Sequence, residues 1–127
     1  MDEQDTWEQF GSMFVEKVRD DAIKGLTLDA QESSKGIIAI AFRNALQTSN
    51  ISFQQLMTEL GPYIVDSALQ TMLHFIYHQE AVDLTFRTAD GESVSIKRIS
   101  DGLAGDLILW IREYSKYGSS IIDIHHD

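Results

Sequence analysis

The 127-residue sequence predicts an α+β fold, with four or five helices packed against one antiparallel β-hairpin. Through most of the chain, apolar residues recur every three or four positions, a spacing typical of amphipathic helices. Between residues 82 and 97 the period changes to two, which indicates strands. The length fits one domain (residues 1–127), and a content of 43% hydrophobic residues is enough for a sizeable core.

The first helix is expected to begin at Thr6, because Thr6 and Gln9 have the spacing of a capping box. Gly25 is expected to end this helix, since glycine adopts the left-handed conformation of many helix ends. Residues 26–31 would then form a loop that crosses back over the core. The predicted buried stripe consists of Trp7, Phe10, Phe14, Val18 and Ala22.

A second helix is expected after Ser33 or Ser34, either of which can cap it. Residues 36–42 are also typical of a buried strand, and the length of the apolar segment favours a helix. Its apolar positions are Ile37, Ile38, Ala41, Phe42, Ala45 and Leu46.

A second capping box, from Ser52 to Gln55, predicts a short helix that runs to Gly61. Pro62 is expected to prevent that helix from continuing and to open the next one. Residues 63–79 are apolar around most of a helical circumference, which is typical of a central helix. Its polar ridge consists of Ser67, Gln70, Thr71, His74 and His78.

The hairpin is predicted from alternating apolar residues on both sides of a turn at residues 88–91, with Gly91 in place. The inward-facing positions are Val82, Leu84, Phe86, Val94 and Ile96. A two-stranded sheet leaves its edges unpaired, and unpaired edges recruit another chain. We therefore expect either a third short C-terminal strand at residues 121–124 or a homodimer joined through the hairpin edge.

The last helix is expected to begin after Ser100 as its cap and to end at Gly118. Its apolar stripe consists of Leu103, Leu107, Trp110, Ile111 and Tyr114. We expect the hairpin to bury its apolar side chains against this helix, because two strands alone are marginal in water.

Charge excludes several classes of partner. The chain has 20 acidic and 10 basic residues, so its formal charge is −10, and it should repel nucleic acid and anionic membranes. The absence of cysteine excludes disulfides and thiolate chemistry. The sequence has no apolar run long enough for a membrane span, and its acidic start does not resemble an export signal, so a cytoplasmic location is expected.

The middle of the chain suggests a partner-binding surface. Residues 44–86 contain no lysine or arginine, and they include four acids: Glu59, Asp66, Glu80 and Asp83. Together with the acids at the start of the chain, these residues predict a negative face that could meet a basic protein. The alternative interpretation is that the acidic surface serves only solubility.

Candidate chemical sites are sparse. His74 and His78 are four residues apart on a helix, a spacing that suits zinc, but a third ligand would have to come from Asp66, Glu80 or the tail residues 125–127. Gly102 and Gly105 resemble a phosphate-binding loop, and flanking acids oppose that interpretation. The paired acids Asp20 and Asp21 are attributed to a solvated helix end. Neither a catalytic motif nor a cofactor fingerprint occurs, so neither an enzyme nor a cofactor is predicted.

These observations predict a small acidic, non-enzymatic interaction module that binds a basic protein. Its most concrete form is an inhibitor of the immunity or antitoxin type, in which a compact acidic domain covers the basic face of a toxin. The alternative is a small-molecule or metal-binding domain that uses the ridge of His74 and His78.

Overall fold

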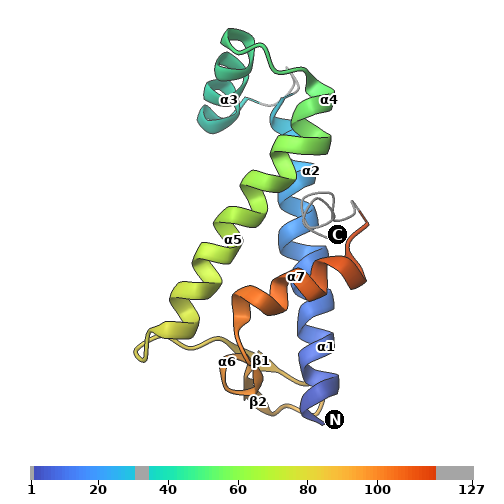
Figure 1. Ribbon diagram of the computed structural model, residues 1–127, viewed down its shortest axis with the longest axis vertical. Helices are drawn as coiled ribbons and strands as arrows, with labels where there is room; N and C mark the ends of the chain where they lie inside the picture. Colours follow the sequence, from blue (N-terminus) through green and yellow to red (C-terminus); the bar gives the residue numbers. More distant parts are fainter. Residues whose placement is uncertain (1, 31–34, 117–127) are drawn as a thin grey trace, which may run out of the picture.

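A computed structural model describes residues 2–30 and 35–116 (Figure 1). These residues are mostly helical and carry a two-stranded antiparallel sheet, so the predicted α+β class is confirmed. The elements in chain order are α1 (Glu3–Phe14), the π-helix η1 (Val15–Arg19), α2 (Asp20–Asp29), α3 (Ile37–Thr48), α4 (Phe53–Gln55), the π-helix η2 (Leu56–Leu60), α5 (Gly61–His78), β1 (Thr85–Arg87), β2 (Ser93–Ser95), α6 (Ile96–Ile99) and α7 (Leu103–Tyr114).

The first helix begins earlier than predicted. Asp2 is its N-cap, and the Asp2 carboxylate accepts a hydrogen bond from the Asp5 amide at 2.7 Å. Thr6 is therefore an internal, buried residue, and its hydroxyl donates to the Asp2 carbonyl oxygen. The predicted start at Thr6 was wrong because an acidic side chain four residues upstream already caps the helix.

The same helix also buries a different face beyond Phe14. The π-turn η1 adds one residue to a helical turn, which rotates the following side chains by about 100°. As a result Val15, Arg19 and Ile23 are buried, whereas Val18 and Ala22 are exposed. Only Phe10 and Phe14 of the predicted stripe are buried, and Trp7 is half-buried.

Two further boundaries of this helix differ from the predictions. The helix passes through Gly25 and ends at Asp29, so residues 26–29 are helical and do not form the expected crossing loop. Glycine permits a helix end without requiring one. The predicted caps Ser33 and Ser34 lie outside the described residues.

The second helical rod is α4, η2 and α5, which follow one another without a break. The predicted capping box at Ser52 is confirmed, with both of its reciprocal hydrogen bonds present. Pro62 does not separate two helices as predicted. The π-turn η2 closes through a hydrogen bond from the Gly61 amide to the Leu56 carbonyl oxygen, and Pro62 follows directly as the second residue of α5.

Helix α5 is less buried than the prediction of a central helix implies. Its fully buried residues are Gly61, Pro62 and Leu73, and its outer face exposes Ile64, Phe75 and other large side chains. Helix α5 packs on α7 and also contacts α2 and η1.

The predicted hairpin is confirmed, although its strands are short. Phe86 pairs with Val94, and the Gly91 amide donates to the Thr88 carbonyl oxygen across a turn in which Gly91 has a φ of 90°. Ile96 is fully buried as expected, but it begins α6 and is not part of the strand.

Helix α7 matches its predicted stripe. Leu103, Leu107, Trp110 and Ile111 are buried in the main core, where they meet Phe10 and Phe14 of α1, and Tyr114 packs at the margin. Helix α7 begins at Leu103, two residues later than a Ser100 cap would place it, and the Ser100 hydroxyl accepts from the Gly102 amide. It ends at Tyr114, before Gly118, and the predicted strand at residues 121–124 lies outside the described residues.

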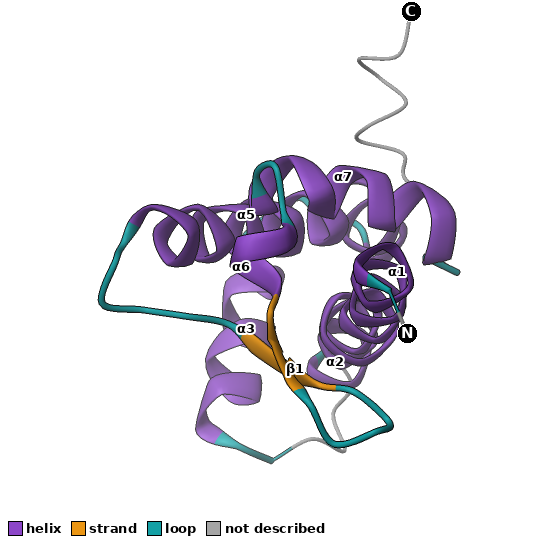
Figure 2. Ribbon diagram, turned by 90° about the horizontal axis from the view of Figure 1, so that it is seen from below, coloured by secondary structure: helices purple, strands orange, loops and turns teal. Residues whose placement is uncertain are grey.

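Helix α3 is confirmed as a helix and not a strand, but it stands apart from the main core. It packs on α2, and Ala39 is its only fully buried residue. Figures 1 and 2 place α3 and α5 on the same side of the molecule, away from α1.

Candidate functional site

The acidic end of the molecule is formed by two segments that are distant in sequence. The first turn of α1 brings Asp2 and Glu3 beside β2, and the hairpin turn brings Asp90 and Glu92 to the same end (Figure 1). A shallow groove between them is lined by Asp2, Glu3 and Glu92, and Arg98 contributes a positive charge. We call Asp2, Glu3, Asp90 and Glu92 the acidic end.

All four carboxylates of the acidic end are exposed. Two of them also have local structural roles, because Asp2 caps α1 and Asp90 accepts hydrogen bonds from the Thr88 hydroxyl and the Glu92 amide. These hydrogen bonds, with that of Thr88 the stronger, lower the pKa of Asp90 below its ordinary value. The hairpin therefore holds Asp90 in its charged form.

The four partner-binding residues predicted from the sequence do not meet in one place. Glu59 lies in η2, and Glu80 follows the other end of α5, about 30 Å away along the helix axis. Glu80 and Asp83 line a shallow pocket together with Lys97 and Arg98. The two acids and two bases of that pocket balance one another.

Asp83 is held by the hairpin. Its carboxylate accepts hydrogen bonds from the Ser95 hydroxyl and the Leu84 amide, each at 2.7 Å. The Ser95 hydrogen bond is the main reason that the pKa of Asp83 is lowered. Lys97 donates to the carbonyl oxygens of Gln79 and Val82, which fixes the chain that leads into β1.

Asp66 belongs to a buried charge network. Arg19, 1% exposed, donates from Nε to Asp66 Oδ1 at 2.9 Å and from Nη2 to Asp66 Oδ2 at 3.1 Å. Its Nη1 donates to Asp20 Oδ1 and to the Ser115 hydroxyl. Burial alone would lower the pKa of Arg19, but hydrogen bonds and charge from Asp66 and Asp20 outweigh burial and raise it.

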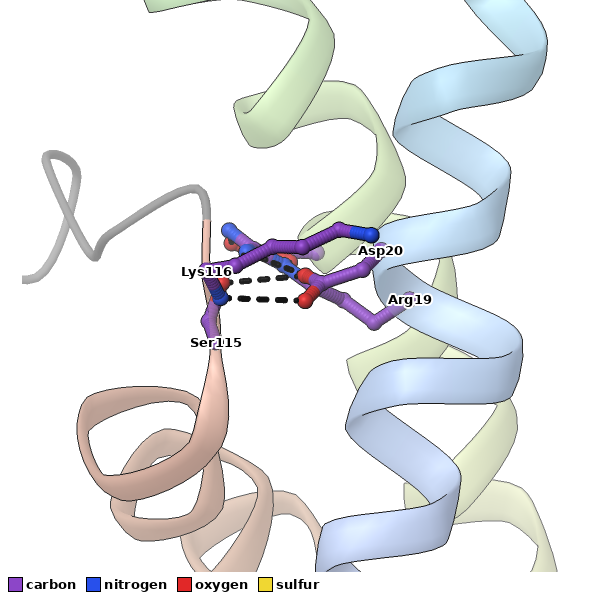
Figure 3. Close-up of polar contacts among 5 residues, drawn as sticks. Arg19, Asp20, Ser115 and Lys116 are labelled. Carbon is purple, nitrogen blue, oxygen red and sulfur yellow. Dashed lines mark hydrogen bonds and ion pairs between the residues drawn. The ribbon is translucent and has the colours of Figure 1, made fainter.

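The other half of this network ties the end of α7 to α2. The Ser115 hydroxyl and the Lys116 amide donate to the two oxygens of Asp20, as the dashed lines in Figure 3 show. Asp20 is 1% exposed, so the expectation that it is a solvated helix-end residue was wrong. The network joins α2, α5 and α7, and its carboxylates are occupied by donors from the protein itself.

The predicted histidine ridge is present on α5. His74 and His78 are exposed, and their ring centroids are 4.3 Å apart. Asp66, one suggested third ligand, is occupied by Arg19, and residues 125–127 lie outside the described part of the chain. Within residues 2–30 and 35–116, no group of three or more potential metal ligands comes together.

A carboxylate of the protein itself lies beside the glycine loop at the start of α7. Asp106, which is 8% exposed, accepts hydrogen bonds from the indole nitrogen of Trp7 at 2.9 Å and from the Ser100 hydroxyl. The carboxylate lies in the first turn of α7, where the helix dipole favours a negative charge. These contacts favour the structural interpretation of the loop.

Comparisons with known proteins add no functional assignment. No protein-family model matches the chain, and neither a curated protein nor a solved structure matches it. Among the described helices, none is both long and apolar enough to cross a membrane.

Proposed function

We propose that this protein is a non-enzymatic interaction module that binds a basic protein partner through its acidic end. One observation carries the proposal: the first turn of α1 and the hairpin turn bring exposed carboxylates together across a groove. Complementary potential between such a face and a basic surface accelerates association and selects among partners. The formal charge of −10 makes nucleic acid and anionic membranes unfavourable as alternatives.

The most specific form of this proposal is an inhibitor of the immunity or antitoxin type in the cytoplasm. Such a protein needs a compact domain, an acidic face and no chemistry of its own. The partner would be a toxin with a basic active face, such as a nuclease, whose substrate-binding surface the acidic end would cover.

Affinity capture from the native host, followed by mass spectrometry, tests whether a basic partner exists. With that partner in hand, association is measured as salt is raised through about 0.1 M, where the Debye length is about 10 Å. We expect the association rate to fall steeply with salt. An association rate that does not change with salt would contradict the proposal.

A double charge reversal locates the surface. Glu3→Lys with Glu92→Lys is expected to slow association by about tenfold or more, because it reverses two exposed charges of the acidic end. The matched control is Glu16→Lys with Glu59→Lys, which makes the same change in net charge at exposed positions outside the acidic end. Equal slowing by both pairs would show a net-charge effect and not a binding face.

The second candidate function is binding of a metal or a small molecule at His74 and His78. The observation in its favour is the 4.3 Å separation of the two rings on one exposed face. The purified protein would then hold a stoichiometric metal such as zinc, and replacing both histidines by alanine would remove it. If no metal is bound, the double variant is expected to change the free energy of unfolding by no more than about 0.5 kcal/mol.

A further inference from the structure

Helix α3 exposes apolar side chains to an unusual degree. Ile37 and Ile38 are 86% and 79% exposed, while Ala39 on the opposite side of the helix is buried. Four apolar residues lie on the outward side of the helix at exposed positions. We call Ile37, Ile38, Ala41 and Ala45 the α3 outer face.

The spacing of this face suits a second helix. Ile38, Ala41 and Ala45 are separated by three and then four residues, which is the spacing of a seam between two packed helices. Ile37 lies one turn before Ala41 on the same side. The two alanines permit close approach of a partner backbone, because the separation of packed helices depends on side-chain size at the contact.

The segment of the chain that contains the α3 outer face has no net charge. Residues 35–79 contain two bases, Lys35 and Arg43, and two acids, Glu59 and Asp66, so the whole formal charge of −10 lies outside them. Arg43 donates to the Asp29 carbonyl oxygen, and Asp66 is paired with Arg19. The α3 outer face therefore presents apolar surface without a carboxylate of its own.

We propose that a second copy of this chain packs on the α3 outer face in a two-fold contact. The α3 outer face offers a basic partner no carboxylate of its own, whereas two copies that carry −10 each repel one another least where they meet through surfaces without net charge. An apolar neutral patch is complementary to itself, as a two-fold contact requires. This surface is separate from the acidic end, so it adds to the proposed function and does not depend on it.

Sedimentation velocity on the full chain over a range of concentrations tests the contact. The wild type is expected to move from 14.4 kDa toward twice that mass as its concentration rises. Ala41→Glu is expected to raise the dimer dissociation constant at least about a hundredfold, because a two-fold contact places two added carboxylates together. The matched control, Gln47→Glu, adds the same charge at an exposed position of α3 outside this face. It should change the dimer dissociation constant by less than about threefold.

Far-ultraviolet circular dichroism establishes that each variant is folded. If Ala41→Glu does not fold, Ile37→Gln at the most exposed position replaces it, with the same expected direction. A wild type that stays monomeric throughout the concentration range overturns the proposal. If that monomer co-sediments with neutral phosphatidylcholine vesicles, the face binds a membrane surface instead. If the dimer persists in Ala41→Glu but is lost in Arg87→Asp, a substitution in β1, the proposal is overturned and the copies pair through the hairpin edge.

Discussion

At position 11, the lack of a side chain lets α1 approach α7. A Cβ at Gly11 would lie 2.2 Å from ring atoms of Trp110, whose side chain is fully buried. Gly11→Ala is therefore expected to lower the free energy of unfolding by about 3 kcal/mol through overpacking. Urea denaturation measures this loss.

Gly25 provides the matched control, since it is also helical and a Cβ there would meet no atom within 4 Å. Gly25→Ala is expected to raise the free energy of unfolding by about 0.5–1 kcal/mol, because alanine loses less backbone entropy in a helix. If both substitutions destabilise the protein equally, Gly11 does not lie against the Trp110 ring as described.

Arg19 is the cation of the buried charge network that joins α2, α5 and α7. Arg19→Met leaves two carboxylates, one fully buried, without their cationic partner, and it is expected to cost about 3–5 kcal/mol of unfolding free energy. Arg112→Met, an exposed arginine of α7, should cost less than about 0.5 kcal/mol. Chemical denaturation measures both losses of unfolding free energy. Equal losses in the two variants would contradict the buried network.

This network could not be predicted from the sequence. Arg19 and Asp66 are 47 residues apart, and neither lies in a local motif. A constant helical period of 3.6 residues placed Arg19 away from the core, and a single π-turn reversed that placement. Without the π-turn, an unpaired arginine on a helix surface is the ordinary expectation.

Among the elements, those with regular geometry and local signals could be predicted. The stripe of α7 and the capping box at Ser52 each depend on residues within a few positions of one another, and both are confirmed. Predictions failed where two signals competed, as at Asp2 and Thr6, or where a π-turn changed the period. The acidic end was missed in part because its two turns are about 90 residues apart and meet only through tertiary packing.

The hairpin should depend on pH in the acid range. The pKa values of Asp83 and Asp90 are both lowered from their ordinary 3.8 by hydrogen bonds within the hairpin. Their contribution to stability is therefore complete above pH 3.8, and it is lost as pH falls through the lower values of the folded state. Carboxyl NMR titration should show both residues titrating below 3.8.

Ser95→Ala separates these two groups. It removes the main hydrogen bond to Asp83, so the pKa of Asp83 should return toward 3.8 while that of Asp90 stays low. A titration in which Asp83 is unchanged in this variant would contradict the assigned cause.

For the molecule as a whole, charge is divided unevenly. The segment 35–79 is neutral, and the remainder carries the full −10, with several acids at one end. Repulsion among these acids should destabilise the fold, so the midpoint of thermal unfolding is expected to rise as salt screens it. Calorimetry at fixed protein concentration measures this rise, which should be smaller in Glu3→Gln with Glu92→Gln. A midpoint of thermal unfolding that does not change with salt would contradict destabilisation by this repulsion.

Both tryptophans of the chain lie at one joint. The ring centroids of Trp7 and Trp110 are 5.2 Å apart where α1 meets α7, and Trp7 is hydrogen-bonded to Asp106. Indole emission therefore monitors that joint alone, because the distant helix α3 contains no tryptophan. A thermal unfolding curve recorded by tryptophan fluorescence would follow the separation of α1 from α7, whereas circular dichroism follows all helices. A difference between the two unfolding midpoints would therefore show that α3 unfolds by itself.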